Sequence, residues 1–277
     1  MRENKEGMDY GLRIMAEVLK AEHLHWGYFP DKKFKGEEMT LTGLKEAQLD
    51  YTKHLFMFIP DTVQSILDVG AGLGKTAYLL TNNGYQVSCL SNDKYQQTKI
   101  NEKYPAIPVI KNKFEDSRLG QTFDLILMSE SVQYLNWPQT LYKLEEVLKP
   151  GGFLLTSDYF RKADSSFYKT CKVRESFEIA TKNKFDLIKE EDITDNILPT
   201  LDFAMYGFNN YILPAANIVS ELICNSTPPV VKCLANIFLR KQLQKAQYYI
   251  WGHTPEKFDR EKFKQEMYYV IQLWSRK

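Results

Sequence analysis

The sequence has little of what marks exported, metal-dependent or membrane-spanning proteins. Only four cysteines occur, none in a C-x-x-C pair, and the four histidines complete no metal-ligand spacing, so neither a disulfide framework nor a metal site is expected. Residues 1–7 are charged and contain no apolar core, so we expect no export signal. The apolar stretch 211–239 is interrupted by proline, asparagine and lysine, and we expect no stable membrane insertion.

Charge of one sign is also lacking. The formal net charge is +1 over 277 residues, so bulk electrostatics gives no support for a nucleic-acid partner. With 44% hydrophobic and 26% charged residues, the composition is that of an ordinary globular protein. We expect a cytoplasmic protein that is a monomer or a homodimer.

What the sequence does contain is an alternation of strand and helix patterns. Strands are predicted at 65–69, 86–91, 109–111, 123–129, 153–158, 185–188 and 267–274. Helices are predicted at 10–21, 42–58 and 166–181, and others start near Gly74, Lys94 and Trp137. Strands that alternate with helices indicate an α/β fold with a parallel sheet covered on both faces.

Residues 195–264 form a long apolar and aromatic segment, which is too long to be a loop in a compact domain. It contains Phe203, Tyr206, Phe208, Tyr211, Phe238, Tyr248, Tyr249 and Trp251. We interpret it as a helical lid inserted into a single domain. The predicted division is an N-terminal helical cover (1–60), a cofactor-binding core (61–194), the lid (195–264) and a last core strand (265–277).

The most informative motif is a glycine-rich turn between the strand at 65–69 and the next helix. It reads Leu-Asp-Val-Gly-Ala-Gly-Leu-Gly over residues 67–74, and its glycines let the backbone turn tightly and approach a ligand. The dinucleotide fingerprint is G-x-G-x-x-G with a later acid, whereas here the spacing is G-x-G-x-G and Asp68 precedes the glycines. A dehydrogenase is therefore only a distant alternative.

Three motifs in order resemble the class I S-adenosylmethionine-dependent methyltransferases. Residues 67–74 are similar to the first motif of that family, 123–129 to its fourth-strand motif, and 148–155 to the phrase before its fifth strand. The resemblance implies S-adenosyl-L-methionine as cofactor. It also implies a Rossmann-like seven-stranded sheet, mostly parallel with an antiparallel last strand. Ser91 in place of the usual ribose-binding acid, with Gln96 after it, resembles the branch that methylates small molecules such as sugars, tocopherols and sarcosine.

The resemblance also implies which residues would hold the cofactor. The glycine turn would approach the methionine moiety and the ribose, and Asp68 would bond to the methionine amino group. Phe114 and Glu115 follow the third strand, where the family recognises adenine; Lys113 stands where the usual acid is expected. The implied cofactor-binding residues are Tyr28, Asp68, Gly70, Ala71, Gly72, Gly74, Ser91, Asn92, Gln96, Phe114, Glu115 and Ser129.

Three residues are candidates for the catalytic side. Tyr28 lies in a His-Trp-Gly-Tyr segment similar to one that folds over the methionine end in small-molecule members. Glu130 and Tyr134 follow the fourth strand, at the edge where open α/β sheets bind ligands.

The predicted function is methyl transfer to an O, N or C atom of a small acceptor, itself partly apolar or aromatic, by in-line displacement at the sulfonium methyl. Alternatives are a lipid-modifying enzyme of the cyclopropane-synthase kind, for which the amphipathic region 218–238 would meet a membrane surface, and a non-catalytic cofactor-binding protein.

Overall fold

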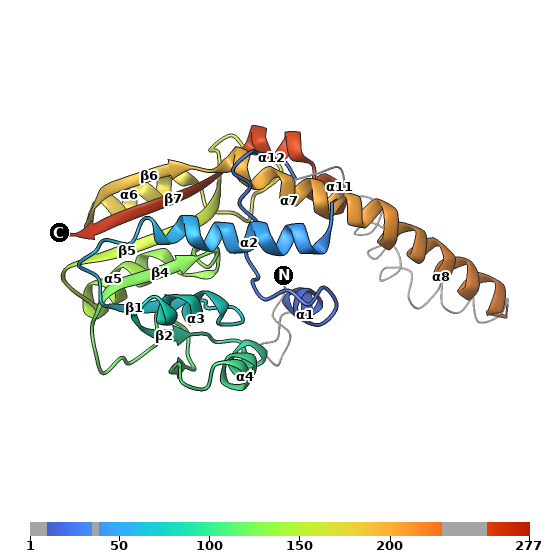
Figure 1. Ribbon diagram of the computed structural model, residues 1–277. Coiled ribbons are helices and arrows are strands. Elements are labelled where there is room, and N and C mark those ends of the chain that lie inside the picture. Colours follow the sequence, from blue (N-terminus) through green and yellow to red (C-terminus); the bar gives the residue numbers. More distant parts are fainter. Residues whose placement is uncertain (1–9, 35–38, 229–253) are drawn as a thin grey trace.

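The computed structural model describes residues 10–34, 39–228 and 254–277 (Figure 1). Seven strands form one sheet in the order β3-β2-β1-β4-β5-β7-β6. The strands are β1 (Ser65–Val69), β2 (Gln86–Leu90), β3 (Val109–Ile110), β4 (Phe123–Ser129), β5 (Leu148–Arg161), β6 (Phe185–Asp192) and β7 (Met267–Arg276). Strands β1 to β5 pair in parallel, and β7 runs antiparallel to β5 and β6. The predicted mostly parallel sheet with an antiparallel last strand is confirmed.

The helices lie before, between and after these strands. They are α1 (Tyr10–Glu17), α2 (Leu41–Phe56), α3 (Lys75–Asn82), α4 (Lys94–Lys103), α5 (Trp137–Val147), α6 (Arg174–Lys182), α7 (Thr194–Gly207), α8 (Leu213–Ser226), α11 (Thr254–Lys257) and α12 (Arg260–Glu266). A 3₁₀ turn, η1 (Val132–Tyr134), follows β4, and a π-helical turn, η2 (Phe208–Ile212), joins α7 to α8.

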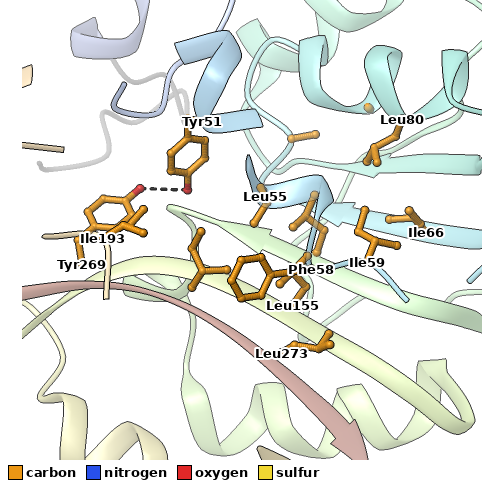
Figure 2. Close-up of a cluster of buried hydrophobic side chains, with 14 of the residues drawn as sticks. Tyr51, Leu55, Phe58, Ile59, Ile66, Leu80, Leu155, Ile193, Tyr269 and Leu273 are labelled. Carbon is orange, nitrogen blue, oxygen red and sulfur yellow. Dashed lines mark hydrogen bonds between the residues drawn. The ribbon is translucent and has the colours of Figure 1, made fainter. Parts of the chain in front are cut away.

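Both faces of the sheet are buried, because alternate residues of each strand enter different cores. On one face, Ile66, Leu127 and Leu155 pack with residues of α2, α3 and α7. Figure 2 shows Ile66 and Leu155 in this cluster together with Leu55 of α2 and Leu80 of α3. On the other, Leu67 and Met128 pack with residues of α5 and α6. The sheet is thus a rigid layer, and the loops at the carboxyl ends of β1, β4 and β5 are positioned by it.

The helix predicted at 166–181 is wrong in its first half, because α6 begins only at Arg174. The Glu266 carboxylate accepts hydrogen bonds from the Ser165 hydroxyl at 2.8 Å and the Phe167 amide at 3.0 Å. Bonds to a residue about 100 positions away hold this backbone in an irregular path. Helical periodicity cannot reveal such a partner.

The strand predicted at 153–158 is longer at both ends, because β5 begins at Leu148, directly after α5 ends at Val147, and continues to Arg161. The Leu148–Gly152 phrase is part of β5 itself, where pairing with β4 shifts between Phe123↔Leu148 and Leu125↔Phe153. A Cβ on Gly152 would lie 2.9 Å from the Lys149 carbonyl oxygen, so the irregularity needs glycine. The phrase is a bulge in the strand.

The predicted lid region begins with α7 and α8, while residues 229–253 lie outside the described ranges. Helix α7 buries Ile197, Leu198 and Leu201 against the sheet. Helix α8 extends away from the sheet (Figure 1) and buries none of its residues. The described part of this region therefore does not close over the glycine turn.

Among the helices that the structure describes, none is both long and apolar enough to cross a bilayer.

Candidate cofactor and acceptor site

The glycine turn joins β1 to α3 through residues with positive φ. Gly70 has φ +80° and Gly72 has φ +55°, conformations that side chains other than glycine rarely adopt. A Cβ on Gly70 would lie 2.6 Å from the Ser131 Cβ, whereas a Cβ on Gly72 would meet only the Leu24 side chain, at 3.5–3.8 Å. Gly70 thus permits close packing of the turn against the loop after β4, and Gly72 faces the N-terminal segment.

Asp68 lies beneath this turn, on β1, and is 3% exposed. Its Oδ2 atom is buried and has no hydrogen-bond partner among the described residues. Burial raises the pKa of the Asp68 carboxyl to about 7. Buried polar atoms in folded proteins are normally hydrogen-bonded, so this oxygen fits a ligand that brings a donor to the turn.

The loop after β2 is held together by its own polar side chains. The Ser91 hydroxyl donates to Gln96 Oε1 at 2.8 Å and accepts from the Asp93 amide at 3.1 Å. Asp93 in turn caps α4 by accepting from the Gln96 amide at 2.8 Å. Ser91 and Gln96 are buried and Asn92 is exposed. The Ser91–Gln96 pair therefore fixes the loop at the carboxyl end of β2.

The two residues predicted to lie where adenine is recognised, Phe114 and Glu115, have different environments. Phe114 is 1% exposed and packs in the core with Val69 and Leu90. The Glu115 carboxylate accepts from the Asn136 amide at 2.7 Å and the Thr140 hydroxyl at 3.3 Å. Glu115 thus binds the N-terminal end of α5.

A polar cluster lies near the carboxyl ends of β4 and β5. It consists of the buried Tyr51, Ser157 and Tyr269 and the half-buried Ser129 and Glu130. The Tyr51 hydroxyl donates to Ser157 Oγ at 2.5 Å and lies 3.0 Å from Ser129 Oγ. The Tyr269 hydroxyl donates to Glu130 Oε1 at 2.7 Å and lies 3.1 Å from the Tyr51 hydroxyl (Figure 2). Burial raises the pKa of Glu130 to about 8.

Residues 22–29, which we name the cover segment, pass over this edge of the sheet. The Trp26 amide donates to Glu130 Oε1 at 2.7 Å and the Gly27 amide donates to Thr200 Oγ1 at 3.0 Å. The Tyr28 amide donates to the Ala47 carbonyl at 2.9 Å. These bonds tie the cover segment to the sheet edge, α2 and α7.

The three predicted catalytic residues are not brought together. The Tyr28 ring stacks on His54 with centroids 4.2 Å apart, and Leu24 rather than Tyr28 provides the atoms nearest Gly72. Tyr134 is 75% exposed. Glu130 alone lies between the cover segment and the sheet edge.

Sequence reasoning missed Tyr51, Ser157, Asp158 and Tyr269. Asp158 is fully buried and accepts from the Val132 and Tyr159 amides at 2.8 Å each. Its signal was present, because it ends the predicted strand 153–158. Tyr51 and Tyr269 carry no local signal, since their hydroxyls meet across 218 positions.

No metal is implied by this arrangement. Within residues 10–34, 39–228 and 254–277, no group of three or more His, Cys, Asp or Glu side chains is placed to hold an ion.

Comparison with known proteins gives one matching family, described as a methyltransferase domain, over residues 67–156. An uncharacterized methyltransferase of Alkaliphilus oremlandii is 26% identical over 165 residues, 56% of this chain and 76% of the relative. The geranyl diphosphate C-methyltransferase of Streptomyces coelicolor superposes with TM-score 0.67 at 13% identity, covering 95% of this chain and 93% of that one.

The [4+2]-cyclase SpnF superposes with TM-score 0.66 at 16% identity, covering 96% of this chain and 93% of that one. At these identities the superpositions establish the fold. The matched segment contains the glycine turn, β4 and the bulged start of β5.

Proposed function

We propose that this chain, which belongs to the class I S-adenosylmethionine-dependent methyltransferases, methylates a small-molecule acceptor that is partly apolar or aromatic. The observation that carries the proposal is the glycine turn with the unpartnered Asp68 oxygen, roofed by the cover segment. Because the cover segment is held by hydrogen bonds to Glu130, Thr200 and Ala47, an acceptor that reacts beneath it must be small. We expect the protein to act in the cytoplasm as a monomer or homodimer.

The residues at the turn fit the cofactor. When bound, S-adenosylmethionine supplies an electrophilic methyl group on a sulfonium. Gly70, Ala71, Gly72 and Gly74 would hold it through backbone groups, and Asp68 would accept from its methionine amino group. The loops after β2, β3 and β4, with Ser91, Gln96, Phe114 and Ser129, would border the rest.

The cover segment supplies alignment and exclusion of water, which are the main contributions that methyl transfer to a nucleophilic acceptor needs. The Trp26 ring lies 5.2 Å from Phe263 and 5.9 Å from Tyr269, centroid to centroid. Of these three rings only the Trp26 ring is partly exposed, and it would suit an apolar or aromatic acceptor. We assign Glu130 as a positioning residue, because its Oε1 is occupied by the Trp26 amide and the Tyr269 hydroxyl. Tyr28 and Tyr134 remain predictions.

The test is transfer of label from methyl-tritiated S-adenosylmethionine. The chain is incubated with a cell extract separated into small molecules and macromolecules. We expect label in the small-molecule fraction and an equal amount of S-adenosylhomocysteine. Calorimetry of the chain alone should detect cofactor binding at micromolar to millimolar concentration. Label in protein or nucleic acid would contradict the small-acceptor proposal, and binding without label transfer would indicate a cyclase-like or non-catalytic protein.

A second candidate, a lipid-modifying enzyme of the cyclopropane-synthase kind, is favoured by one observation. Helix α8 leaves Ile218, Val219, Leu222 and Ile223 more than half exposed, as an interfacial helix would. If this candidate is right, the chain co-sediments with anionic phospholipid vesicles and Leu222→Glu weakens the association. If the chain stays in the supernatant at all lipid concentrations, this candidate is excluded.

A further inference from the structure

His25 is held in one tautomer by its contacts. Its Nδ1 lies 2.9 Å from the Trp26 carbonyl oxygen, and a carbonyl only accepts, so Nδ1 carries the hydrogen. Burial lowers the pKa of His25 to about 4, so at neutral pH the ring has a single N–H. Its Nε2 is therefore a bare acceptor.

The same reasoning fixes His23. His25 Nε2 lies 2.9 Å from His23 Nδ1, and two bare nitrogens would repel, so His23 Nδ1 donates. The Thr52 hydroxyl lies 3.2 Å from the same His25 nitrogen and donates to the Gln48 carbonyl at 3.2 Å. His23 Nε2 is then left as a bare lone pair. This atom is buried and has no partner among the described residues.

His23 sits in the part of the cover segment that touches the glycine turn. Its neighbour Leu24 provides the atoms nearest Gly72. On its other side, the Glu22 carboxylate pairs at 2.9 Å with Lys75, the first residue of α3. The unpartnered Asp68 oxygen lies on β1 just before the same turn. Both unsatisfied acceptors thus lie on segments that border the glycine turn.

We infer that His23 Nε2 and Asp68 together accept hydrogen bonds from the α-ammonium group of the bound cofactor, an assignment that rests on the proposed function. An ammonium group offers three donors and no acceptor. A carboxylate cannot take its place beside His23 Nε2, because its oxygens would face a lone pair. The hydrogen bonds from Trp26 through His25 to His23 fix the His23 tautomer. The bare Nε2 of this tautomer favours the amine end of the methionine moiety over its carboxylate end.

Two properties of the site support this role. Burial lowers the pKa of His23 to about 2, with further lowering by His25 and Lys75, so the lone pair stays available at neutral pH. Such a ring is a poor proton acceptor for catalysis but a good fixed hydrogen-bond acceptor. The branched end of the flexible Leu24 side chain, next to His23, lies over Gly72.

The test compares two ligands by calorimetry: S-adenosylhomocysteine and its analogue with hydrogen in place of the α-amino group. We expect His23→Phe to weaken binding of the first about 10- to 100-fold, the value of a hydrogen bond to a charged group, and to change binding of the second by less than about 3-fold. Tyr168→Phe, which removes a buried hydroxyl bonded to the Lys257 carbonyl, should leave both affinities unchanged.

A second measurement uses only the wild-type chain, so it remains possible if His23→Phe does not fold. In ¹⁵N-histidine NMR of the wild-type chain, His23 should show a protonated Nδ1 and a bare Nε2. The Nε2 signal should shift when S-adenosylhomocysteine binds and not when the deaminated analogue binds. Equal losses for both ligands in His23→Phe, or an Nε2–H tautomer, would overturn the inference. Absence of any S-adenosylhomocysteine binding by the wild type would instead overturn the proposed function.

Discussion

Gly72→Val is expected to abolish binding of S-adenosylmethionine while the chain remains folded. The Cβ at this position points toward the cover segment, where its three nearest atoms belong to the flexible Leu24 side chain, at 3.5–3.8 Å. The fold can therefore accommodate added atoms, but a ligand that lies on the turn cannot. We expect a loss of affinity of about 100-fold or more, equivalent to about 3 kcal/mol, measured by calorimetry.

Gly84→Val is the matched control for backbone strain. Gly84 also has a positive φ, +92°, and a Cβ there would meet nothing within 4 Å. Both variants should lose about 1–2 kcal/mol of unfolding free energy from the left-handed conformation, but Gly84→Val should bind the cofactor normally. Unchanged binding by Gly72→Val, or equal loss in both variants, would show that the turn does not hold the ligand. Gly70 is unsuitable for this test because its Cβ would collide with Ser131 at 2.6 Å.

The sequence predicted best those elements whose signals are local. The bounds of β1 and β4 agree with prediction to the residue, because each is an apolar run that stops at glycine or polar residues. The glycine turn could also be predicted from the sequence, since its three positive-φ positions favour glycine.

The site could be predicted only as far as the turn. The cover segment depends on bonds such as Trp26 to Glu130, which join positions 104 apart, and no periodicity reports such pairs. Tyr28 was predicted to face the cofactor from its place in a motif, yet its ring stacks on His54. Side-chain direction in an irregular segment follows from packing, which the sequence alone does not fix.

The buried carboxyl groups give the second large effect: the free energy of unfolding should fall as the pH rises from about 7 to about 8. The pKa of Glu130 is raised from 4.5 to about 8, mainly by burial. The folded chain therefore holds a proton that the unfolded chain has already released. This stabilisation is complete below pH 4.5 and is lost as the pH rises through 8, by about 1.4 kcal/mol per pH unit while only the folded state is protonated.

Other buried ionisable groups determine the pH range in which the effect of Glu130 can be measured. Asp68 and Asp158, each with a pKa of about 7, also lower the free energy of unfolding as the pH rises. Their contribution ends near pH 7, below the pH at which that of Glu130 ends. His23 and His25, with pKa values of about 2 and about 4, act in the opposite direction below pH 6.5, where the unfolded histidines take up protons. Above pH 7, Glu130 therefore dominates the slope.

Glu130→Gln tests this assignment, because an amide keeps an acceptor for the Trp26 amide and the Tyr269 hydroxyl but cannot ionise. In urea unfolding, the variant should match the wild type near pH 5 and exceed it by a few kcal/mol at pH 8. Glu130→Ala, which leaves both donors unpartnered, should be less stable than Glu130→Gln by about 2–3 kcal/mol at every pH. If wild type and Glu130→Gln kept parallel pH profiles, Glu130 would be ionised in the folded chain. A charged carboxylate beside the cover segment would then be available as a base, and the catalytic role first predicted for Glu130 would replace the positioning role assigned from its contacts.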